Sequence, residues 1–206
     1  MMTRINIHTA RNNAGFSLIE VLITMIIILV GLLSIAALQA KAQIAEFESY
    51  QRAQGLIMLS DIVDRINLNR ETLSCFAITT NTAAGTPFIG AAGTGHAGTP
   101  ACAASTTEYN DLADDTINAL DDLLQGAAES EGGTDVGAMI GARACVSYDS
   151  TTEVGGQPGT GLYTVVVTWQ ALAALTAPSY NCANGLYGNE NMRRAVSTQF
   201  RVADLY

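Results

Sequence analysis

The sequence predicts an α+β fold in which a long N-terminal helix, apolar in its first half, packs on an antiparallel β-sheet head. Three observations predict it. Residues 16–38 form an apolar run of 23 residues with one ionisable side chain, Glu20. Residues 41–69 lack proline and repeat apolar side chains at three- and four-residue steps, which is typical of a helix. Stretches that alternate apolar and polar residues come only after residue 143, and this order favours an α+β head.

The composition limits the classes of partner. The 206 residues suffice for one domain with an appendage. With 10 Lys and Arg against 19 Asp and Glu the net charge is −9, so we expect no nucleic-acid partner and no electrostatic binding to anionic lipid. The mean hydropathy of +0.23 is raised by the single apolar segment at residues 16–40.

The apolar run is long enough to cross a membrane, because 23 residues at about 1.5 Å each cover a hydrocarbon core of about 30 Å. Arg4 and Arg11 precede it without any acid, whereas Glu46 and Glu48 accompany the basic residues that follow, so we expect a cytoplasmic N-terminus. A carboxylate in such a helix costs on the order of 3 kcal/mol near the bilayer centre and less near an end. Glu20 therefore needs an explanation.

Three interpretations of the N-terminal segment are open from the residues alone. A secretory signal would have a shorter apolar core, although Ala40-Lys41-Ala42 looks like a cleavage site. An uncleaved anchor explains the length and the flanking charges but leaves Glu20 without a role. A cut between Gly15 and Phe16 is the third interpretation, because a glycine lets a protease approach the backbone closely.

The segment Gly15-Phe16-Ser17-Leu18-Ile19-Glu20 resembles the processing motif of type IV prepilins and of the pseudopilins of type II secretion. The resemblance implies a type IV pilin-like fold, cleavage after Gly15 by prepilin peptidase and N-methylation of Phe16. It implies a single-pass protein of the inner membrane with a periplasmic head, which later joins a pilus at the cell surface.

Residues 30–39, VGLLSIAALQ, resemble the PilV type of minor pilin. This resemblance implies a low-copy subunit that joins other minor and major pilins at the fibre tip and primes assembly from the inner-membrane platform. A pseudopilin and a membrane-anchored periplasmic binding protein are the alternatives. Many major pilins carry a proline late in this helix, and residues 16–86 here contain none.

We expect four segments: a leader at 1–15, a membrane and polymerisation half-helix at 16–40, an amphipathic half-helix at 41–70 and a head at 71–206. The amphipathic half-helix is predicted to bury one stripe. Its members are Leu56, Leu59, Ile62, Val63 and Ile66.

In the head, residues 83–107 are predicted to form a loop because of their composition. Residues 93–98, GTGHAG, fit a dinucleotide-binding pattern, but we expect neither a strand before them nor a helix after them, so no cofactor is predicted.

Residues 108–126 predict a short helix, with Asp111 as its N-cap, Gly126 as its end and an apolar face of Ala113, Ile117, Leu120 and Leu124. Its aspartates lack the spacing of a calcium loop, so we favour a solvated acidic face and no metal. Strands are predicted at residues 144–149, 162–170 and 196–202.

The four cysteines all follow the apolar run, which suits an oxidising compartment, and they contain no zinc-type spacing. Four cysteines allow three pairings, and the sequence alone does not choose among them. We favour Cys75–Cys102, joining the end of the long helix to the glycine-rich loop, and Cys145–Cys182, joining the sheet to the late turn region.

The sequence disfavours an enzyme. Of its two histidines, His8 would leave with the leader, and His96 stands alone in the glycine-rich loop. The charge of Glu20 fits an assembly role instead. Cleavage would create a new amine at Phe16, and in a fibre of staggered helices the carboxylate of Glu20 could meet the amine of a neighbouring subunit.

Overall fold

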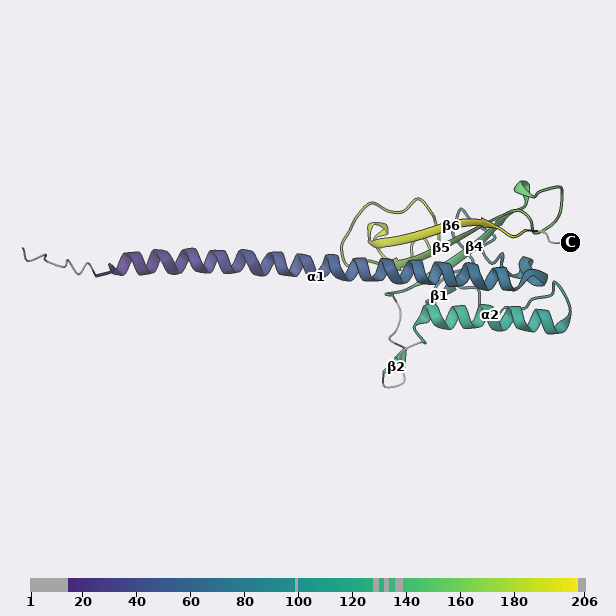
Figure 1. Ribbon diagram of the computed structural model, residues 1–206, viewed down its shortest axis with the longest axis horizontal. Helices are drawn as coiled ribbons and strands as arrows, with labels where there is room; N and C mark the ends of the chain where they lie inside the picture. Colours follow the sequence, from purple (N-terminus) through teal and green to yellow (C-terminus); the bar gives the residue numbers. More distant parts are fainter. Residues whose placement is uncertain (1–14, 99, 128–129, 132–133, 136–138, 204–206) are drawn as a thin grey trace, which may run out of the picture. The chain divides into compact units, whose positions relative to one another are not determined.

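The computed structural model describes residues 15–98, 100–127, 130–131, 134–135 and 139–203 (Figure 1). The chain divides into two compact units, residues 1–43 and residues 44–206. Helix α1, Leu18–Leu68, begins in the first unit and ends in the second. The predicted helix of residues 16–69 is confirmed.

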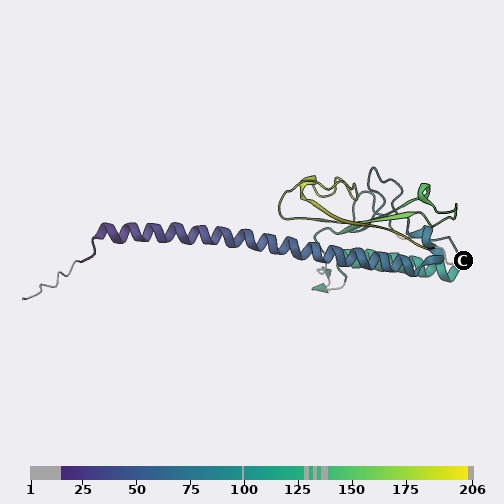
Figure 2. The same ribbon diagram turned by 45° about the horizontal axis from the view of Figure 1, so that its top comes forward.

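The second unit contains a four-stranded antiparallel sheet in the order β1-β4-β5-β6. Its strands are β1 (Ile89–Gly90), β4 (Arg143–Asp149), β5 (Leu162–Gln170) and β6 (Arg193–Arg201). A separate two-stranded ribbon pairs β2 (Ser130–Glu131) with β3 (Thr134–Asp135). Helix α2 spans Thr107–Gln125, and three short 3₁₀ helices span Arg70–Phe76 (η1), Ser150–Thr152 (η2) and Glu190–Met192 (η3). The predicted α+β class is confirmed (Figure 2).

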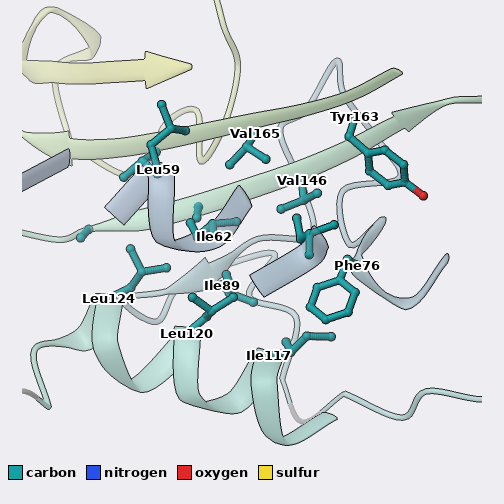
Figure 3. Close-up of a cluster of buried hydrophobic side chains, with 14 of the residues drawn as sticks. Leu59, Ile62, Phe76, Ile89, Ile117, Leu120, Leu124, Val146, Tyr163 and Val165 are labelled. Carbon is teal, nitrogen blue, oxygen red and sulfur yellow. The ribbon is translucent and has the colours of Figure 1, made fainter. Parts of the chain in front are cut away.

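The main core lies where α1, α2 and one face of the sheet meet (Figure 3). Side chains alternate between the two faces of a strand, so residues two apart on β4 and β5 point to the same core. Val146 and Val165 face Leu59 and Ile62 of α1, and Leu120 of α2 completes the contact region (Figure 3). Burying each such side chain contributes roughly 1.5–3 kcal/mol.

The opposite face of the sheet carries a second, smaller core. Cys145 and Val166 point to that side, and Cys182, Ala183 and Tyr187 of the loop between β5 and β6 cover them. Both faces are therefore buried, which explains why β5 contains Val165, Val166 and Val167 in succession instead of strict alternation.

Three details of the sequence prediction are wrong. The stripe of α1 is buried at Gln51, Gly55, Leu59, Ile62 and Ile66, whereas Leu56 is 50% exposed, because it lies about 100° around the helix from Gly55. Helix α2 has Thr106 as its N-cap, so Asp111 lies inside the helix, while Gly126 does end it in a left-handed conformation.

The third wrong detail is the loop at residues 83–107. Ile89 and Gly90 within it pair with Ala144 and Arg143 as strand β1. A strand therefore does end just before the GTGHAG pattern at residues 93–98. No helix begins among the described residues 91–106, so the pattern still lacks the helix N-terminus that binds a pyrophosphate.

Candidate functional site

The start of helix α1 is capped by Ser17. Its side-chain oxygen Oγ accepts a hydrogen bond from the Glu20 backbone N–H at 3.2 Å, and its carbonyl accepts one from the Val21 N–H at 3.3 Å. A serine followed three residues later by a glutamate is the sequence pattern of a capping box. The cap holds Glu20 in the first turn, where the helix dipole favours a negative charge.

Gly15 and Phe16 precede this cap. The Phe16 side chain is 84% exposed. Apart from the two adjacent residues, no described atom lies within 4 Å of the position that a Cβ at Gly15 would occupy, so packing against the described residues does not require glycine there.

In the apolar half of α1, the hydroxyl side chains have hydrogen-bond partners within the helix, whereas the carboxylate of Glu20 has none among the described residues. Thr24 Oγ1 donates to the Val21 carbonyl at 2.8 Å, and Ser34 Oγ donates to the Val30 carbonyl at 2.9 Å. Both hydroxyls are thus satisfied by their own helix, as polar groups in lipid must be. The carboxylate of Glu20 forms no hydrogen bond or ion pair with the described residues, and it is open to a partner outside the chain.

The surface of this half-helix is apolar on all sides. An 18-residue window of α1 has a mean hydropathy of 3.0 and none of it is buried, so among the described residues α1 is the helix long and apolar enough to span a membrane. Even the bulky side chains are exposed, for example Leu18 at 88% and Leu33 at 74%. Such a helix surface is stable in an apolar environment such as lipid or other apolar helices.

Two disulfides stabilise the second unit. Cys75 of η1 bonds Cys102 of the loop before α2, with 5.5 Å between the Cα atoms. Cys145 of β4 bonds Cys182 of the loop between β5 and β6, with 5.7 Å between the Cα atoms. These are the two pairs that the sequence analysis favours.

The remaining candidates form no catalytic or metal site among the described residues. His96 Nε2 lies 2.9 Å from Asp121 Oδ1, and the same oxygen accepts from the Gly90 N–H at 2.6 Å, so this pair joins β1 to α2. Asp114 accepts from the Cys102 N–H at 2.8 Å and organises the loop before α2. No group of three or more potential metal ligands occurs in the described part of the chain.

Sequence reasoning missed two features of the chain. Ser17 could have been found, because the Ser17…Glu20 spacing is visible in the sequence. Glu48 could not: its Oε1 accepts from the Ala173 N–H at 3.1 Å and lies 3.5 Å from Arg194 Nη2, contacts with residues far away in the sequence.

Residues 10–36 match the family model for the prokaryotic N-terminal methylation motif. This match identifies the N-terminal segment as type IV prepilin-like, and it indicates a structural subunit that is processed by prepilin peptidase and associates with pilins. No curated protein and no solved structure matches the chain.

Proposed function

We propose that this chain is a minor pilin, a structural subunit of a type IV pilus that helps to prime assembly in a complex of minor pilins at the fibre tip. One observation carries the proposal: the methylation motif leads directly into a half-helix whose apolar surface is unburied. Lipid can cover that surface before assembly, and similar helices of other pilins can cover it in a fibre.

The chain has four functional segments, of which processing removes the first. Residues 1–15 are the leader, residues 16–40 the membrane and polymerisation half-helix, residues 41–70 the amphipathic half-helix and residues 71–206 the head. Prepilin peptidase cleaves after Gly15, and Phe16 becomes an N-methylated N-terminus. Loss of Arg4 and Arg11 with the leader changes the net charge from −9 to −11.

Glu20 sets the axial register between subunits. It lies four residues after the new amine, in the first turn of α1. In a fibre of staggered helices its carboxylate meets the amine of the neighbouring subunit. Two unit charges at 4 Å attract by about 4 kcal/mol at an effective dielectric constant of 20, which is comparable with the cost, on the order of 3 kcal/mol, of placing the Glu20 carboxylate in an apolar helix. The absence of a partner within the described chain supports this role.

The minor-pilin role rests on the similarity of residues 30–39 to the PilV type. The subunit starts in the inner membrane with its N-terminus in the cytoplasm and its head in the periplasm. It contacts the assembly platform there and then passes into the pilus with other minor and major pilins.

The deciding experiment is N-terminal mass analysis of the full chain extracted from membranes and from sheared surface fibres. A mature chain beginning at N-methyl-Phe16 is expected in both fractions, and replacing Gly15 by a bulky residue should leave the precursor in the inner membrane. A chain that begins at Met1 in surface fibres would overturn the processing.

Deletion of the gene tests the assembly role. Fewer surface fibres are expected, with the protein present at low copy in those of the wild type. Dominance of this chain in the fibre would contradict the minor role, and loss of protein secretion with normal piliation would instead identify a pseudopilin.

A further inference from the structure

Strand β6 leaves one edge of the four-stranded sheet open. It pairs with β5 from Arg193 to Arg201, and in the described part of the chain no strand pairs with its other side. Backbone groups alternate between the two sides of an antiparallel strand. Because the Met192 carbonyl accepts from the Ala171 N–H on the β5 side, the even-numbered residues of β6 bond β5.

The odd-numbered residues of β6 therefore direct their backbone groups outward. The N–H and C=O groups of Ala195, Ser197 and Gln199 have no hydrogen-bond partner among the described residues. They extend along about 13 Å of strand. The strand contains no proline and no bulge, two features that block pairing at an edge, and its charged residues lie only at its ends, at Arg193, Arg194 and Arg201.

A pocket lies where this open edge begins. It has a volume of about 320 Å³ and combines α1, β5, β6 and the loop that follows β5. Its lining includes Glu48, Arg52, Trp169, Leu175, Arg194 and Ala195. Ala195 is thus both a wall of the pocket and the first of the three outward-facing residues, so a strand added to the edge would pass the pocket.

Arg52 is the one arginine of residues 44–203 without a hydrogen bond or ion pair to another described residue. Arg194 is paired with Glu48, and Arg193 with Glu190 at 2.6 Å. Arg65 pairs with an aspartate, and the others donate to backbone carbonyls. The pocket therefore offers a free cation beside the apolar surfaces of Trp169 and Leu175.

The charges along β6 disfavour a second copy of this strand as the occupant. Strand β6 contains three arginines and no aspartate or glutamate, so a second copy of it would bring no carboxylate to Arg52. An acidic segment would bring one, and the unpaired Arg52 complements its charge.

We propose that the open edge of β6 accepts an extended segment of a partner protein as a fifth strand, with an acidic side chain of that segment placed beside Arg52. Hydrogen bonds to Ala195, Ser197 and Gln199 supply the affinity, and the carboxylate fixes the register of the added strand. This interaction does not depend on cleavage at Gly15, so it stands or falls separately from the proposed function.

The test uses the full chain in detergent micelles and two hexapeptide probes of alternating valine and threonine, one with glutamate at its amino end and one with glutamate at its carboxyl end. Binding is followed by fluorescence anisotropy. We expect one of the two probes to bind. Its affinity should fall by at least about tenfold when the backbone amides on one edge of the peptide are N-methylated, and it should stay unchanged when the amides on the opposite edge are N-methylated. Binding that ignores the side of methylation, or that is absent for both probes, would overturn the proposal.

Two variants test the protein side. Arg52→Gln should weaken binding of the probe by about tenfold, whereas Arg70→Gln, which removes another exposed arginine that does not line the pocket, should not change it. Ser197→Pro removes an N–H that β5 does not use, and it should abolish binding while the circular dichroism spectrum is retained. If that variant does not fold, the peptide methylation and Arg52→Gln decide. An equal loss of affinity for the probe in Arg52→Gln and Arg70→Gln would contradict the role proposed for Arg52.

Amide hydrogen exchange identifies the occupant. Protection of Ala195, Ser197 and Gln199 on addition of the probe is the expected result. Protection that grows with protein concentration in the absence of the probe would instead show a second copy at the edge and would overturn the choice of an acidic partner.

Discussion

The backbone N–H of Glu20 has a partner in the described chain, whereas its carboxylate has none. Ser17 accepts a hydrogen bond from its backbone, which fixes the first turn of α1 and needs nothing from the carboxylate. The carboxylate itself has no partner in the described chain, so the cap and the proposed register contact can be separated by mutation.

Glu20→Ala should leave cleavage and membrane insertion unchanged, because alanine keeps the backbone N–H that Ser17 caps and removes a charge that lipid disfavours. Incorporation into fibres should fall strongly, since the attraction of about 4 kcal/mol to the neighbouring amine is lost. Quantitative blotting of membrane and fibre fractions measures both. Ser17→Ala is the matched control, with a cost of about 1 kcal/mol in the cap and normal incorporation; unchanged incorporation of Glu20→Ala would make the carboxylate incidental.

Ionisation of Tyr163 at alkaline pH lowers the stability of the second unit. Burial, together with the smaller effects of the nearby Tyr148 and Glu153, raises the pKa of Tyr163 to about 12. The folded state thus favours the neutral phenol, and the resulting stability is complete below the unfolded pKa of about 10 and is lost as the pH rises from there to about 12.

Urea unfolding of the full chain should therefore show a midpoint that falls from about pH 10 upward. Tyr163→Phe keeps the ring next to Phe200, with 5.6 Å between the ring centroids, and should reduce the fall of the urea midpoint with pH. Part of this fall should remain, because burial also raises the pKa of Tyr148 and of Tyr187. An equal fall of the midpoint in the variant and the wild type would exclude Tyr163 as a cause.

At the scale of an element, α1 shows how a helix accommodates a bulky neighbour. A Cβ at Gly55 would lie 2.9 Å from Cζ3 of Trp169, whose ring is buried. Glycine at this position lets the helix approach β5 closely, which is why a residue that weakens helices is tolerated in the middle of one.

Gly55→Ala should lower the free energy of unfolding by up to about 2 kcal/mol, because overpacking against Trp169 costs about 1–3 kcal/mol and the gain in helix propensity returns about 1 kcal/mol. Gly31→Ala is the matched control on the same helix, since no atom lies within 4 Å of its added Cβ. Chemical denaturation followed by tryptophan fluorescence reports the difference. A stabilised Gly55→Ala variant would mean that the ring of Trp169 can move aside.

Elements with a strong local pattern could be predicted from the sequence. The length of α1, the buried face of α2 at Ile117 and Leu120, and strand β5 all follow from periodicity within one segment. Strand β1 could not be found, since two residues in a glycine-rich segment have no period and their pairing depends on β4. The stripe of α1 was misplaced for the same reason, because contact with Trp169 selects Gly55.

The candidate site divides in the same way. The methylation motif at residues 10–36 is linear, so the sequence alone identifies it. The open edge of β6 and the pocket beside it require the sheet order and the position of the loop after β5, neither of which a local pattern contains.

At the scale of the whole molecule, each disulfide holds a long irregular segment against a regular element. Replacing Cys145 and Cys182 together by alanine removes a link across 37 residues and should cost about 3–4 kcal/mol. Hydrogen exchange should increase in the loop between β5 and β6, because that loop covers the smaller core. The corresponding change at Cys75 and Cys102, 27 residues apart, is the control and should leave that loop protected. Unchanged exchange in both variants would show that packing alone fixes the loop.

The exposed apolar half of α1 also limits the environments into which this molecule can pass. Sixteen large apolar side chains between Phe16 and Leu38 are exposed. At roughly 1.5–3 kcal/mol each, their transfer into water costs tens of kcal/mol, more than the roughly 5–15 kcal/mol that keeps a domain folded. A route through free solution is therefore closed to the intact chain. Transfer from lipid to a bundle of similar helices exchanges one apolar environment for another, so its free energy is small. Differences in a few polar contacts are then enough to decide its direction.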